Sequence, residues 1–159
     1  MKFSKSLIIV IILPLFLYFP SLSGEFLAFD DELLVLDNAT VHGLNFSNVT
    51  EAFTTYDPEL YVPLTLLTYQ IEWSLVQDNP LLYHITNLLI HILSSLFVYL
   101  ILKKFFTEKI AVICALIFAL HPIQVEAVAW ISGRKDLLAS MFFLASTYTY
   151  LKWKDEDKY

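Results

Sequence analysis

Four apolar stretches separated by polar segments dominate the sequence. They cover residues 7–19, 81–102, 110–120 and 137–153. An apolar run of about 20 residues is long enough for a helix to cross a bilayer, and shorter runs need their flanking residues to do so. The pattern therefore predicts an all-α membrane protein with about four transmembrane helices.

This pattern divides the chain into three parts. Residues 1–20 are predicted to form the first transmembrane helix, and residues 21–79 a large polar loop. Residues 80–159 are predicted to hold three more transmembrane helices, short loops and a charged tail. Because Ser21-Leu22-Ser23-Gly24 resembles a signal-peptidase site, a cleaved signal peptide is the alternative for the first part.

The loop of residues 21–79 is acidic and contains neither lysine nor arginine. Its ten acids are Glu25, Asp30, Asp31, Glu32, Asp37, Glu51, Asp57, Glu59, Glu72 and Asp78. Apolar residues recur at helical spacing between Tyr61 and Val76, and Pro63 suits a first helical turn. We therefore expect an amphipathic helix here, lying at the membrane surface.

The basic residues indicate how the helices are oriented. Arg134 and Lys135 belong to the connection between the third and fourth apolar stretches, and the other eight fall at the opposite ends: Lys2, Lys5, Lys103, Lys104, Lys109, Lys152, Lys154 and Lys158. Lysine and arginine concentrate on the cytoplasmic side. The N-terminus is therefore predicted to be cytoplasmic, and residues 21–79 and 121–136 are predicted to share the extracytoplasmic side. The membrane would be the cell (inner) membrane in a prokaryote and the endoplasmic reticulum in a eukaryote.

Composition agrees with a lipid environment. Hydrophobic types make up 57% of the chain and charged types 16%, whereas a soluble domain carries about 25% charged residues. The net charge of −6 gives no indication of nucleic-acid binding. Membrane lipid is the expected partner.

Asp30 and Asp31 are the first candidates for chemistry. They follow the first apolar stretch, where partial desolvation can bring a carboxyl group towards the working range of a general base. Paired carboxylates can also hold a divalent cation such as Mg²⁺ or Mn²⁺. A solvated acidic loop without catalytic function is the alternative interpretation.

Two further groups of polar residues are candidates for substrate binding. His84, Asn87 and His91 share one face of the second predicted helix. His84 and Asn87 bind a ligand or fix helix packing, whereas His91 lies deeper and is expected to be structural. The second group comprises His121, Glu126 and Arg134. Pro122 interrupts the third helix beside them, and Arg134 suits a phosphate. An ion pair of Arg134 with Glu126 or Asp136 is the alternative.

Several strings, taken together and in this order, resemble a known family. They are Phe29-Asp30-Asp31, Ala52-Phe53-Thr54-Thr55, Pro63-Leu64-Thr65, residues 83–91 (YHITNLLIH), residues 118–131 (FALHPIQVEAVAWI) and residues 134–138 (RKDLL). The chain resembles the N-terminal membrane region of TPR-containing GT-C-type glycosyltransferases, relatives of the transmembrane and TPR repeat-containing O-mannosyltransferases. The resemblance extends from about Phe29 to Trp153.

This resemblance implies an inverting enzyme. Such an enzyme would transfer a sugar from a polyprenyl-phosphate donor to a protein or glycan acceptor on the extracytoplasmic side. Asp30 and Asp31 match the family's acidic catalytic motif, whereas His84, Asn87, His121 and Glu126 match positions without a known role. Tyr61-Val62 stands where relatives often have Trp-His.

The family fold also has more helices, followed by TPR repeats. The chain is therefore expected to be an N-terminal fragment, and we do not expect four helices to form a complete donor pocket. A non-catalytic membrane scaffold or assembly protein that keeps the fold is the alternative function.

Overall fold

The structure, a computed structural model, describes residues 5–56 and 60–156. These residues form helices and connecting segments without a strand, which confirms the all-α class. Four charged residues used in the predictions above lie outside the described residues: Lys2, Asp57, Glu59 and Lys158.

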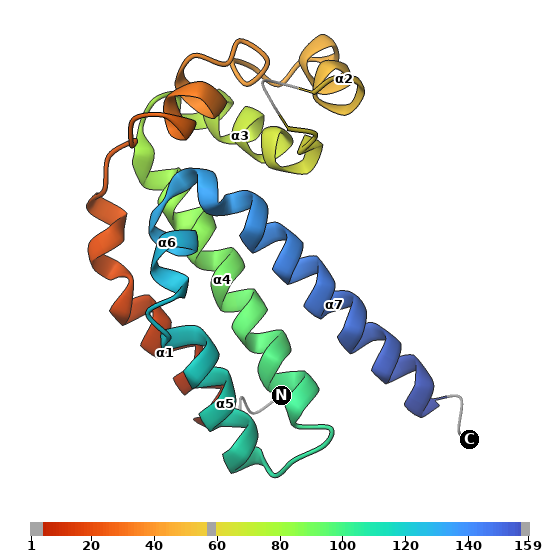
Figure 1. The fold of residues 1–159 in the computed structure, drawn as a ribbon. Helices are drawn as coiled ribbons and strands as arrows, with labels where there is room; N and C mark the ends of the chain where they lie inside the picture. The colour runs from red at the N-terminus through yellow and green to blue at the C-terminus, as the bar shows by residue number, and fades with distance from the viewer. Residues whose placement is uncertain (1–4, 57–59, 157–159) are drawn as a thin grey trace.

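Four helices run alongside one another in a bundle (Figure 1). They are α1 (Lys5–Leu17), α4 (Pro80–Leu102), α5 (Glu108–Leu120) and α7 (Arg134–Glu156). Helix α4 packs against each of the other three, and α1 also packs against α5. The bundle helices correspond to the four predicted apolar stretches.

Helix α5 packs closely because one of its faces is made of small residues. Ala111, Ala115 and Ala119 follow each other at intervals of four residues and are fully buried. Such spacing lets helix backbones approach each other in a membrane protein. The helix ends at Leu120, and His121 is extended before Pro122, so the predicted break is confirmed.

Shorter elements cover one end of the bundle (Figure 1). They are η2 (Glu32–Leu36), α2 (Phe46–Thr54) and α3 (Pro63–Val76), and we call these elements and the segments that connect them, residues 24–56 and 60–79, the cap. The short η1 (Phe19–Ser23) continues α1 and packs against α4. The predicted helix at residues 61–76 is therefore present as α3, with Pro63 in its first turn. Its position at a membrane surface stays a prediction.

The cap and the bundle share a hydrophobic core. Its buried residues are Leu34, Val35, Val41, Ala52, Leu66, Tyr69, Tyr83 and Ile131. The segment from α5 to α7 contributes to this core, because it folds back as α6 (Gln124–Ala129) and η3 (Ile131–Gly133). The cap therefore rests on the connection between α5 and α7.

Gly133 makes that fold-back compact. A Cβ atom at this position would lie 2.6 Å from the carbonyl oxygen of Ala127. Such a contact is closer than van der Waals packing allows. A glycine is therefore required where η3 meets α6.

The prediction of about four transmembrane helices is not confirmed as such. Among the described residues, only α4 is long and apolar enough to cross a bilayer. Helices α1 and α5 have 13 residues each, about 20 Å of helix. Helix α7 has 23 residues, but it carries charges at both ends and hydroxyl side chains between them.

The two ends of the bundle carry different charged contacts. At one end, Lys104 after α4 forms an ion pair with Asp155 near the end of α7. At the other end, Lys135 at the start of α7 lies 3.5 Å from Asp30 of the cap, measured from Nζ to Oδ2. The acidic pair and the residue 121–136 segment therefore meet at the same end of the molecule.

Candidate active site

Asp31 attaches the cap to the bundle and is fully buried. Its Oδ1 accepts hydrogen bonds from the backbone N–H (2.9 Å) and the hydroxyl of Ser132, 101 residues later in the chain. Its Oδ2 accepts a hydrogen bond of 2.9 Å from the Leu27 N–H. Both carboxylate oxygens thus have partners within the protein, which a buried carboxylate needs.

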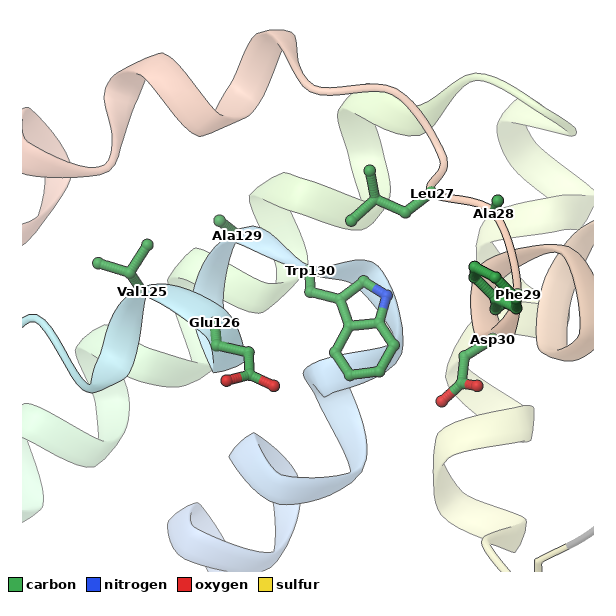
Figure 2. A pocket seen from close by; sticks show the side chains of 8 residues that line it. All are labelled: Leu27, Ala28, Phe29, Asp30, Val125, Glu126, Ala129 and Trp130. Carbon is green, nitrogen blue, oxygen red and sulfur yellow. The ribbon is translucent and has the colours of Figure 1, made fainter.

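Asp30 has a different environment although it is the next residue in the chain. Its side chain is 42% exposed and pairs with Lys135. It lines a pocket of about 530 Å³, with the side chains that Figure 2 shows: Leu27, Ala28, Phe29, Asp30, Val125, Glu126, Ala129 and Trp130. Pockets that bind small molecules have about this size, mostly apolar walls and a few polar groups.

The backbone before Asp30 is strained. Phe29 has a φ angle of 75°, in the left-handed region that a bulky residue rarely adopts. Such strain persists only where surrounding contacts hold it, and it is frequent at functional sites. Here the buried Asp31 holds the chain in place, and the turn directs Asp30 to the pocket.

Arg134 lies in the interior rather than at the pocket. The guanidinium is fully buried and donates to Asn87 Oδ1 (2.8 Å), Thr68 Oγ1 (3.1 Å), the Tyr83 carbonyl (2.7 Å) and the Glu72 carboxylate. A contact with a donor phosphate would require it to leave these partners. Its ion pair is with Glu72 and not with Glu126 or Asp136, so the alternative interpretation, an ion pair with one of those two acids, was wrong.

Burial changes the acidity of two side chains around Arg134. It raises the pKa of the Glu72 carboxyl, and the adjacent guanidinium counteracts part of that rise. Burial also raises the pKa of the Tyr69 hydroxyl, which donates a hydrogen bond of 2.9 Å to the Ile131 carbonyl. The Tyr69 ring lies under the guanidinium, 4.7 Å from its centroid to Cζ. These groups form one polar cluster between α3, α4 and α7.

Asn87 connects this cluster to the candidate site. While its oxygen accepts from Arg134, its amide donates to the carbonyls of Trp130 (2.8 Å) and Ile131 (3.3 Å). These carbonyls immediately precede Ser132, which binds Asp31. The position of Asp30 therefore depends on a chain of contacts that begins in α3 and α4.

The predicted histidines occupy different environments. His84 is buried beside Gly24, and its ring nitrogens make no hydrogen bond of ordinary geometry among the described residues. His91 is fully buried, and its Nε2 pairs with the Ala119 carbonyl at 2.9 Å. His121 is exposed, and its Nδ1 accepts from the Ile123 N–H. None of the three lines the pocket of Asp30.

Glu126 is the one predicted substrate-binding residue in this pocket. It is exposed and comes from α6, on the side opposite to Asp30 (Figure 2). The structure therefore brings together Asp30, Asp31 and Glu126 around one end of the bundle. Substrate binding by Glu126, Arg134, His84, Asn87 and His121 stays a prediction.

The described residues do not fit a divalent cation. They contain no group of three or more His, Cys, Asp or Glu side chains arranged to hold a metal ion. Asp31 uses both oxygens within the protein, and Asp30 faces a lysine. No step of the proposed transfer is therefore assigned to a metal ion, and the Mg²⁺ or Mn²⁺ requirement stays a prediction.

Sequence reasoning missed three residues that shape the site. Ser132 binds Asp31, Trp130 lines the pocket, and Lys135 pairs with Asp30. A tryptophan near the end of an apolar stretch is usually interpreted as an anchor at the membrane interface. A single serine in a short connection belongs to no recognisable sequence pattern. Lys135 could have been identified because it is one of two bases on the side of the acidic loop.

The fold and the site define a class of protein: a helical bundle with a candidate membrane-spanning helix and a mostly apolar pocket that holds two carboxylates, between residues 27–30 and 125–130. Residues 58–159 match the family model of dolichyl-phosphate-mannose-protein mannosyltransferase. The chain therefore belongs to the dolichyl-phosphate-mannose-protein mannosyltransferase family.

Curated relatives agree with this assignment. The human protein O-mannosyl-transferase TMTC3 is 36% identical over 137 residues, which cover 81% of this chain and 15% of that protein. The human protein O-mannosyl-transferase TMTC1 is 34% identical over 150 residues, which cover 87% of this chain and 17% of that protein. Protein O-mannosyl-transferase F38B6.6 of Caenorhabditis elegans is 31% identical, covering 93% and 23%. The chain thus spans less than a quarter of the length of these relatives. No solved structure matches it.

Proposed function

We propose that this chain carries the acceptor-activating part of a glycosyltransferase. The enzyme would transfer mannose from a polyprenyl-phosphate donor to a protein hydroxyl group on the extracytoplasmic side of a membrane. The family and its relatives support the sugar, the lipid-phosphate donor and the protein acceptor through their names. The pocket beside Asp30 supports the location of the chemistry.

One observation carries this proposal: of two adjacent carboxylates, Asp30 lines an open pocket and Asp31 is buried with both oxygens bonded. Asp30 is accordingly the catalytic base, and Asp31 is the residue that positions it. The Asp30 carboxylate takes the proton of the acceptor hydroxyl. The hydroxyl oxygen forms a bond to the anomeric carbon. The bond from that carbon to the phosphate oxygen breaks, and its electron pair leaves with the lipid phosphate, inverting the anomeric centre.

The exposed apolar side chains support a multi-pass arrangement. Helix α1 exposes Ile8, Ile9, Ile12, Leu13, Leu15, Phe16 and Leu17, and α5 exposes Ile110, Ile113 and Ile117. Apolar surface of this kind faces lipid or further helices rather than water. In this arrangement all four bundle helices cross the bilayer, α1 and α5 being extended by flanking residues. The cap lies outside, and the N-terminus is cytoplasmic.

Cysteine labelling tests this arrangement. In a Cys114→Ser background, a cysteine introduced by Ala39→Cys is expected to react with a membrane-impermeant maleimide added to intact cells. A cysteine introduced by Phe106→Cys is expected to react only after the membrane is permeabilised, because residues 103–106 carry the cytoplasmic lysines. Both positions are exposed. Labelling of both from the same side would disprove the arrangement.

A transfer assay tests the activity itself. An intact enzyme that contains this chain is reconstituted in phospholipid vesicles and incubated with radiolabelled polyprenyl-phosphate mannose and a peptide rich in serine and threonine. We expect alkali-labile incorporation of mannose into the peptide, and none from free mannose. Absence of transfer, with correct labelling in the previous experiment, would instead support the alternative function.

That alternative is a non-catalytic scaffold that keeps the fold. The bonded interior of the bundle favours it: Arg134, Asn87 and Asp31 all have partners within the protein. A scaffold needs these contacts for packing and has no use for the pocket. The two functions therefore differ in whether changes at Asp30 have any effect.

A further inference from the structure

The wall of the pocket opposite Asp30 has no role in the transfer step described above. It is formed by α6 and the residues after it, and Glu126 and Trp130 are its polar and aromatic side chains. In Figure 2, the Glu126 and Asp30 carboxylates lie on either side of the Trp130 indole. The pocket therefore combines two carboxylate acceptors with two aromatic side chains, the Trp130 indole and the Phe29 ring.

The charges restrict what this pocket accepts. Ionised carboxylates accept hydrogen bonds but do not donate them, so a ligand has to supply the donors. The Glu126 carboxylate makes no hydrogen bond or ion pair among the described residues and is open to such a ligand. Lys135 lies 3.5 Å from Asp30 and 5.4 Å from the Trp130 ring centroid, so a positive charge is already present. It disfavours a second cation in the pocket.

A hexose has the matching chemistry. Its hydroxyl groups donate hydrogen bonds around the rim of the ring, and its C–H groups form faces that fit the electron-rich face of an indole. The apolar side chains of Leu27, Phe29 and Val125 border the same pocket and are exposed. They can contact the isoprenoid part of a lipid-linked sugar while the sugar hydroxyls contact the carboxylates.

We propose that Trp130 and Glu126 bind the hexosyl group of the lipid-linked donor: the indole packs on the sugar ring, and the Glu126 carboxylate accepts hydrogen bonds from its hydroxyls. The inference rests on the proposed function, because it assigns the donor sugar to the pocket of the proposed base. It makes Glu126 a residue that distinguishes a sugar-bearing lipid from a bare lipid phosphate.

Fluorescence titration of the full chain in detergent micelles tests this inference without requiring turnover. In a Trp73→Phe, Trp153→Phe background, Trp130 is the sole tryptophan. The probes are citronellyl-phosphate mannose and citronellyl phosphate, which differ only in the sugar. We expect the mannosyl lipid to change the Trp130 emission and to bind more tightly than the sugar-free lipid.

The variant Glu126→Gln gives the decisive comparison. Glutamine replaces the charged acceptor with one neutral amide oxygen and an NH₂ donor, and hydrogen bonds to a charged acceptor are the stronger ones. We therefore expect the affinity for the mannosyl lipid to fall about tenfold. Affinity for citronellyl phosphate should stay within about twofold. Glu32→Gln is the matched control, because Glu32 is an exposed acid of the cap that does not line this pocket. It should leave both affinities unchanged.

The outcomes separate the two proposals. Equal weakening of both lipids by Glu126→Gln, or no weakening of either, would overturn the assignment of the sugar even if the protein transfers mannose. Selective weakening of the mannosyl lipid would support the assignment even in a protein that shows no transfer. Glu126→Asp is the conservative variant, because it keeps the charge and shortens the side chain. It should retain part of the preference for the mannosyl lipid over citronellyl phosphate, which a misfolded protein would not.

Discussion

Asp30→Asn is expected to lower the rate of mannose transfer by about 10²–10⁴-fold, which is the usual contribution of a general base. Asparagine keeps the size of the side chain but cannot take the acceptor proton. The Asp30 side chain is 42% exposed and its ion pair with Lys135 is long, so the free energy of unfolding should change by less than about 1 kcal/mol. Initial rates at saturating donor, together with a thermal melt, measure both quantities.

Two comparisons make this result specific. Asp37→Asn changes another exposed acid of the cap outside the pocket and should leave the rate unchanged. Asp31→Asn should lower both rate and stability, because it replaces a buried acceptor of three hydrogen bonds. If Asp30→Asn kept full activity, the acidic pair would have no catalytic role and the scaffold alternative would gain support.

Arg134→Met is expected to destabilise the fold by about 3–5 kcal/mol. The change leaves the Glu72 carboxylate buried without its cation, and it removes the donors to Asn87, Thr68 and the Tyr83 carbonyl. We expect a lower melting temperature in detergent. The cap should also lose its attachment to α7, which limited proteolysis of residues 21–79 would detect.

Lys135→Met is the matched control for this experiment. The Lys135 side chain is partly exposed, and its Nζ lies 3.5 Å from the Asp30 carboxylate. Loss of this ion pair should lower the free energy of unfolding by at most about 1 kcal/mol. The double variant Glu72→Gln, Arg134→Met should be less destabilised than the sum of its single variants, because no buried charge remains. A melting temperature of Arg134→Met equal to that of the parent would contradict a structural role for the cluster.

The sequence was sufficient for the helices of the bundle because their signals are local. The apolar stretch of residues 81–102 became α4 (Pro80–Leu102), and Pro122 ended α5 where its ring excludes a helical residue before it. Helical spacing also placed His84, Asn87 and His91 on one face of this helix, and all three side chains are buried in the structure. Whether α1, α5 and α7 cross a membrane depends on lipid and on flanking residues, so their apolar stretches alone left that question open.

The functional distinction between neighbouring residues came only from the tertiary structure. Asp30 and Asp31 are chemically identical and adjacent. Hydrogen bonds from the Leu27 N–H and from the distant Ser132 hold Asp31 in the interior, whereas Asp30 lines the pocket. Arg134 and Lys135 differ in the same way. Arg134 is buried against Glu72 and Asn87, whereas Lys135 pairs with Asp30 beside the pocket. Sequence patterns determine local helix formation and the side of the bundle that a charge occupies. Burial depends on contacts across 47 to 101 residues of chain, which no local pattern encodes.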